Sequence, residues 1–145
     1  MKAMMLGWPF WAVLAAVFAA LTAIFAKIGV EQVDSNLATF IRTLVILAIV
    51  ALMVSATGQW RGMGTIQSRT LVFLVLSGLA TGASWLCYFR ALQIGDAARV
   101  APIDKLSVVL VAIFGATFLG EKLTATNWVG VGLIAAGAVL VALRL

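Results

Sequence analysis

Five apolar stretches, each long enough to cross a lipid bilayer as a helix, follow one another along this chain of 145 residues. The hydrocarbon core of a bilayer is about 30 Å thick and takes about 20 helical residues per crossing. The stretches cover about residues 8–28, 35–57, 70–94, 99–119 and 125–143. Glycine, Asp, Asn and Ser punctuate the short polar loops between them, as helix stops and starts require. The pattern predicts an all-α integral membrane bundle of five transmembrane helices, forming a single domain over residues 1–145.

The composition excludes a soluble domain, because 64% of the residues are hydrophobic and only 10% are charged, against roughly half and a quarter in soluble proteins. The net charge of +5 would suggest nucleic acid in a soluble protein. Here the basic residues mostly lie beside apolar segments, which favours contact with membrane lipids and predicts no nucleic-acid partner. The first apolar stretch is longer than a signal-peptide core and predicts a retained membrane helix.

Residues for acid–base or metal chemistry are scarce. The chain has no histidine and one cysteine, Cys87, so it lacks the commonest metal ligand and general base, and it cannot form an internal disulfide. No paired carboxylates or catalytic motifs occur. We therefore expect no enzymatic activity, no metal and no cofactor.

The charges in the loops are nearly balanced across the membrane. The side of the N-terminus holds Lys2, Arg61, Arg69 and Lys122, and the opposite side holds Lys27, Arg99 and Arg144. Counting residues set deeper in the helices tilts the balance toward an external N-terminus. A near tie permits insertion in both orientations, and thus an antiparallel homodimer.

Four charged residues fall inside the apolar stretches, where charge is costly and needs a reason. Arg42, Arg90, Asp104 and Lys105 are all displaced toward the same face of the membrane, so they could form one polar layer. The alternative is that Arg90 and Lys105 reach the headgroups with their long stems. Arg42 lies deepest. Its polar face continues at helical spacing through Asn36, Thr39 and Thr43.

Asp104 has two interpretations. Pro102 suits the first position of a helix and Asp104 the first turn, where a carboxylate is favourable. Alternatively, Asp104 lines a water-accessible cavity and carries a coupling proton. Adjacent helical residues point about 100° apart, which predicts no local pair with Lys105, so its partner would be Arg42, Arg90 or water.

The third and fifth stretches carry further candidates. Ser84, Trp85 and Tyr88 extend a polar and aromatic stripe from Ser77 and Thr81, which could face a substrate. The alternative is helix packing, since Gly78 and Gly82 form a GxxxG pattern. In the fifth stretch, small residues predict an oligomer contact or packing within one subunit: Gly130, Gly132, Ala136 and Gly137.

The segment "SVVLVAIFGATFLGEKLTATNWVGVGLIAAGAVLVAL", residues 107–143, resembles the closing helix pair of the EamA-type domain of the drug/metabolite transporter superfamily. "YFRALQIGDAARVAPIDKLSVVL" resembles that family's junction between the third and fourth helices. A lone unit is similar to the five-helix bacterial and archaeal branch, which implies an antiparallel homodimer in the inner membrane. The resemblance also implies secondary active transport of a small molecule by alternating access.

One departure bears on the substrate. Small multidrug exporters, four-helix relatives in this superfamily, bind cations through a glutamate in the first helix, and "WPFWAVLAAVFAALTAIFA" contains no acid. The basic residues favour an anionic, zwitterionic or neutral metabolite, or a phosphate-bearing lipid. We therefore predict a transporter of a small metabolite. The main alternative is an accessory membrane subunit, for example half of a heteromeric lipid flippase.

Overall fold

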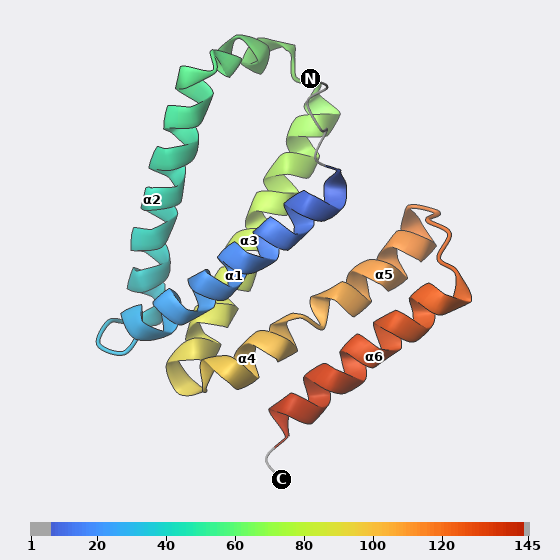
Figure 1. Cartoon of the computed structure of the whole chain (residues 1–145). Coiled ribbons are helices and arrows are strands. Elements are labelled where there is room, and N and C mark those ends of the chain that lie inside the picture. Colours follow the sequence, from blue (N-terminus) through green and yellow to red (C-terminus); the bar gives the residue numbers. More distant parts are fainter. Residues whose placement is uncertain (1–6, 144–145) are drawn as a thin grey trace, which may run out of the picture. The chain divides into compact units, whose positions relative to one another are not determined.

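The computed structural model of the protein describes residues 7–143, and every regular element in that part of the chain is helical. Lys2 and Arg144 of the charge count lie outside it. Figure 1 shows the elements in chain order: α1 Trp8–Gly29, α2 Ser35–Ala56, the short 3-10 helix η1 Gln59–Thr65, α3 Ser68–Ile94, α4 Ala97–Asp104, α5 Ser107–Phe118 and α6 Ala125–Ala142.

Five helical segments in the described residues are long and apolar enough to span a membrane. Four are the single helices α1, α2, α3 and α6, and the fifth comprises α4 and α5 together, Ala97–Phe118. The predicted all-α, five-span architecture is confirmed, and each predicted boundary lies within two residues of the observed one.

Side-chain caps explain where two of the spans begin. The Asp34 carboxylate accepts hydrogen bonds from the backbone N–H groups of Asn36 and Leu37, which starts α2. Thr124 and Asn127 form a capping box that starts α6. Between α5 and α6, Gly120 has φ +69°, a backbone conformation that glycine adopts without steric cost.

The fourth span is broken, and its structure excludes one of the two interpretations of Asp104, in which Pro102 begins a helix. The helix α4 begins at Ala97, so Pro102 lies inside it and Asp104 is its last residue. Proline removes one backbone donor and crowds the preceding turn. Around the break the backbone N–H groups of Leu106, Val108 and Val109 bond to carbonyls three residues back, a tighter turn than an α-helix.

The described residues fall into two compact units. In the unit Ala26–Gln93, a small core forms where the end of α1, the start of α2 and the end of α3 meet. Its buried side chains are Ala26, Val30, Ser35, Thr39, Phe89 and Leu92. The Lys27 Nζ atom donates a hydrogen bond to the Leu92 carbonyl at 2.9 Å, and the Gln93 amide donates one to the Val33 carbonyl. These bonds hold the short α1–α2 connection against the last turn of α3.

The other unit contains residues 7–25 and 94–143 of the described chain. In it, α6 packs against both α4 and α5. The less exposed face of α6 carries one valine and three alanines at helical spacing: Val131, Ala135, Ala138 and Ala142. Arg99 donates a hydrogen bond of 2.6 Å to the Ala142 carbonyl at the end of α6. Packing within the subunit therefore uses this face, whereas Gly132, Ala136 and Gly137 stay exposed.

Candidate functional site

A groove of about 550 Å³ runs between α2 and α3, within the unit Ala26–Gln93. Its walls combine hydroxyl and amide groups with apolar and aromatic surface. The lining residues are Asn36, Thr39, Phe40, Thr43, Leu74, Ser77, Gly78, Thr81, Gly82, Trp85 and Leu86. A hollow of this size falls within the range of small-molecule sites.

The threonine hydroxyls that line the groove donate hydrogen bonds to backbone carbonyls of their own helices. Thr39 and Thr43 donate to the carbonyls of Ser35 and Thr39, each at 2.8 Å, and Thr81 donates to the Ser77 carbonyl at 2.9 Å. A hydroxyl carries one proton and two lone pairs. These three oxygens can therefore only accept further hydrogen bonds.

Glycines open the α3 side of the groove. A Cβ atom added to Gly78 or Gly82 would meet no atom within 4 Å beyond its adjacent residues and the nearby backbone of α3. The close helix contact that a GxxxG pattern permits is thus not made at these positions within the described residues. Instead, the two glycines line the groove without side chains of their own, which leaves space beside Trp85 and Leu86.

The Arg42 guanidinium lies against two aromatic rings of α3. Its Cζ atom is 4.6 Å from the Trp85 ring centroid and 5.1 Å from that of Phe89. A cation over an aromatic face is attracted by about 0.5–2 kcal/mol, depending on desolvation. Within residues 7–143 the structure records no ion pair and no hydrogen bond for the half-buried Arg42 side chain. Trp85 belongs both to this contact and to the groove wall.

Of the predicted site residues, the structure therefore brings Arg42 and Trp85 together. Ser84 is exposed and lies outside the groove wall. Tyr88 is half-buried, with its ring centroid 6.4 Å from that of Phe89. Arg90 is exposed and donates a hydrogen bond to Gln93.

Phe89 was missed in the sequence analysis. Its signal was its position one helical turn after Trp85, on the same face of α3. A phenylalanine in an apolar span differs little from its neighbours, so only the contact with Arg42 distinguishes it.

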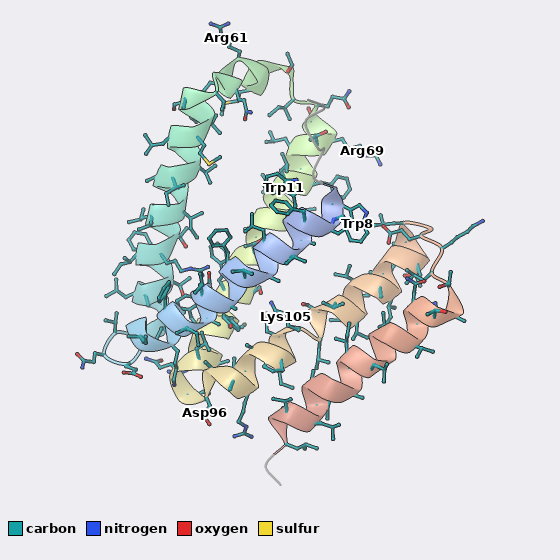
Figure 2. All side chains as sticks on the ribbon, in the orientation of Figure 1. Trp8, Trp11, Arg61, Arg69, Asp96 and Lys105 are labelled. Carbon is teal, nitrogen blue, oxygen red and sulfur yellow. The ribbon has the colours of Figure 1, made fainter. Side chains whose placement is uncertain are left out.

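Asp104 and Lys105 form a local ion pair at the break between α4 and α5, with 3.1 Å between Nζ and Oδ2. The prediction that they could not pair is wrong, because α4 ends at Asp104 and the two residues do not share a continuous helix. Figure 2 labels Lys105 at this junction. Their side chains are 33% and 55% exposed. Arg42 belongs to the other unit, so a cavity shared with Asp104 stays a prediction.

Arg61 and Arg69 lie in the part of the unit Ala26–Gln93 where η1 joins α2 to α3 (Figure 2). Arg69 lines a hollow of about 520 Å³ with Gln67, Thr70, Phe73 and Leu74. Basic side chains at the end of a span suit contact with anionic lipid headgroups. Leu74 lines this hollow and the α2–α3 groove alike.

Comparison with known proteins places the chain in a family. The model of the EamA-like transporter family matches residues 6–143. The chain belongs to the EamA-like transporter family. It is thus a multi-pass membrane protein of a transporter family, as the resemblance in its sequence implied.

Two relatives of this EamA-like protein are informative. It is 67% identical over 135 residues to a Sinorhizobium sp. protein named "Uncharacterized transporter in cobO 3'region", covering 93% of this chain and 96% of that protein. It is 28% identical over 85 residues to "Probable 4-amino-4-deoxy-L-arabinose-phosphoundecaprenol flippase subunit ArnE" of Hamiltonella defensa subsp. Acyrthosiphon pisum (strain 5AT), covering 59% of this chain and 75% of that one. No solved structure matches the chain.

Proposed function

We propose that this EamA-like protein is a secondary active transporter that moves a small anionic, zwitterionic or neutral metabolite by alternating access. The observation that carries the proposal is the α2–α3 groove, which offers polar groups inside membrane-spanning helices. Polar residues there are costly and characteristically mark a substrate path. None of the residues 7–143 that line the groove is acidic, so the groove does not favour a cationic drug.

In this proposal the working unit is an antiparallel homodimer in the inner membrane of a bacterium or archaeon. The near tie of loop charges supports insertion in both orientations. The exposed small residues of α6, Gly132, Ala136 and Gly137, offer a surface for close helix contact between two copies. Gly130 is half-buried and adjoins this surface.

Coupling to a proton gradient is assigned to Asp104. The carboxylate stands at a break in a membrane span, and discontinuous helices supply ion sites in many transporters. Protonation of Asp104 removes its ion pair with Lys105.

The second candidate function is that of an accessory subunit of a lipid flippase. The ArnE-like relative favours it, because the name of that protein describes a flippase subunit. In that case the chain would need a different partner chain to move its cargo.

Reconstitution of the purified chain alone separates the two functions. We expect protein-dependent uptake into liposomes of at least one radiolabelled solute from a panel of carboxylates, amino acids, sugar phosphates and nucleosides. Uptake that appears only after a second, co-purified chain is added would support the accessory subunit instead. Empty liposomes provide the baseline.

Topology mapping tests the antiparallel homodimer separately. Reporters that score each side of the membrane, fused at Met1 and Leu145, should each report both locations. The near tie of charges is the physical reason, and adding two lysines to the 58–67 loop should bias insertion to one orientation. A single orientation in the unmodified chain would remove the homodimer of this type.

A further inference from the structure

We infer that the α2–α3 groove takes a small organic anion with an apolar body and at least one hydrogen-bond donor. Arg42 does not itself line the groove but borders it through its contact with the wall residue Trp85. In this inference Arg42 binds the anionic group, and the threonine oxygens accept hydrogen bonds from the donor groups of the ligand. This inference rests on the proposed transport function and narrows its substrate class. All the residues that carry it lie within the unit Ala26–Gln93.

The anion assignment follows from the contacts of Arg42, because the aromatic rings attract its charge but do not occupy its hydrogen-bond donors. Guanidinium stays protonated at all physiological pH values. The rings of Trp85 and Phe89 attract the cation, but they carry no net charge and accept no strong hydrogen bond from it. The N–H donors of Arg42 therefore remain available for a carboxylate or phosphate, which they match in a two-point contact.

The aromatic contacts also hold the guanidinium in place before the anion arrives. A long arginine side chain otherwise loses conformational freedom when it binds. Phe89 is 2% exposed and sits in the core of its unit, so its ring is a fixed support. Phe89 is a positioning residue in this scheme, since it touches Arg42 and does not line the groove.

The donor requirement follows from the threonine hydroxyls. The hydroxyls of Thr39, Thr43 and Thr81 donate hydrogen bonds to helix carbonyls. Their oxygens can therefore only accept hydrogen bonds from a ligand. An anion without a donor would leave them without a partner once water is displaced, and buried polar groups without partners are costly. An anion with a hydroxyl or amino group satisfies both ends of the site.

The spacing of these groups suits a short molecule. Thr81 lies one helical turn before Trp85, about 6 Å along the axis of α3, and the Arg42 Cζ atom is 4.6 Å from the Trp85 ring. Trp85 therefore separates the cation from the nearest threonine acceptor. The open surface over Gly78 and Gly82 leaves room for the apolar body between the two ends.

The test measures binding by the fluorescence of Trp85 in the full chain, purified in detergent. Replacing Trp8, Trp11, Trp60 and Trp128 by Phe leaves Trp85 as the only tryptophan. The probes are four six-carbon compounds that differ at their ends: hexanoate, 6-hydroxyhexanoate, hexylammonium and hexan-1-ol. We expect saturable fluorescence changes with both carboxylates, and a dissociation constant about fivefold lower for 6-hydroxyhexanoate, because it adds one hydrogen bond.

Two variants test which residue binds the carboxylate of the ligand and which binds its hydroxyl group. Arg42→Gln should weaken both carboxylates at least about tenfold, since it removes a charge-assisted contact. Thr81→Val keeps the side-chain shape and should abolish the preference for 6-hydroxyhexanoate. Hexanoate should bind at least as tightly as to the unmodified protein, because the variant removes an acceptor that hexanoate leaves without a partner. Equal affinity for hexanoate and hexylammonium, or unchanged binding in Arg42→Gln, would overturn the anion assignment. A preference that survives Thr81→Val would overturn the role of the threonine.

This assay distinguishes failure of the inference from failure of the proposed function, because it needs no flux. Uptake of a labelled solute into liposomes without any carboxylate preference in the binding assay would refute the inference and leave the transporter intact. Carboxylate binding without uptake of any solute by the chain alone would refute the self-sufficient transporter and leave the anion site intact.

Discussion

Replacing Arg42 by glutamine lowers the initial rate of solute uptake by about 10- to 100-fold, provided the rate is measured below saturation. The expected loss corresponds to one hydrogen-bonded contact with a charged partner, about 1.5–3 kcal/mol. Glutamine keeps a polar side chain but removes the charge and the cation–π contacts with Trp85 and Phe89. The measurement is uptake of the solute identified by the reconstitution panel, at matched amounts of protein in the liposomes.

Two further variants separate recognition from folding. Arg42→Lys retains the charge without the planar donors and should recover only part of the rate. Arg61→Gln removes an exposed charge from η1, outside the groove, and should leave the rate unchanged. If Arg42→Gln inserts normally and transports at the original rate, Arg42 does not bind the substrate.

Replacing Asp104 by asparagine abolishes uptake driven by a pH gradient, while exchange of labelled for unlabelled solute at equal pH continues. Asparagine cannot take up and release a proton, and it cannot form the charged pair with Lys105. Accumulation against a concentration gradient should therefore fall to the level of empty liposomes. Uptake with an imposed pH gradient, compared with exchange in the same preparation, checks this expectation.

Asp96→Asn is the matched control, because Asp96 is exposed, precedes α4 and has no side-chain capping bond. This variant should keep both activities. Gradient-driven uptake that survives in Asp104→Asn would assign coupling to another group. Loss of exchange together with gradient-driven uptake would instead indicate a structural role at the helix break.

The membrane spans were predictable because they depend on a quantity that sequence carries directly, the length of an apolar run. The break in the fourth span was not. One of the two interpretations of Asp104 placed Pro102 at a helix start, whereas α4 begins five residues earlier. A proline is compatible with both positions, and which one is realised depends on the α3–α4 connection. The Asp104–Lys105 pair was missed for the same reason, since the angular argument assumed an unbroken helix.

The groove was predictable only in part. Helical spacing grouped Asn36, Thr39 and Thr43 on one face of the second span, and the structure places all three in the groove wall. Spacing within a helix does not show which other helix it faces, so the pairing of Arg42 with Trp85 and Phe89 could not be derived. The sequence also does not show that the threonine hydroxyls donate hydrogen bonds to carbonyls of their own helices.

The central claim is that the α2–α3 groove is wet and forms part of the transport path, and single cysteines test it most directly. Cys87→Ser removes the only native thiol, after which Thr81→Cys places a thiol in the groove and Ala83→Cys places one on an exposed part of α3 outside the groove wall. Only two residues apart, the two sites lie at similar depth. A charged, water-soluble thiol reagent should modify Thr81→Cys at least about tenfold faster and block its uptake activity. Equal, slow modification of both would show that no water reaches the groove, and would contradict the account.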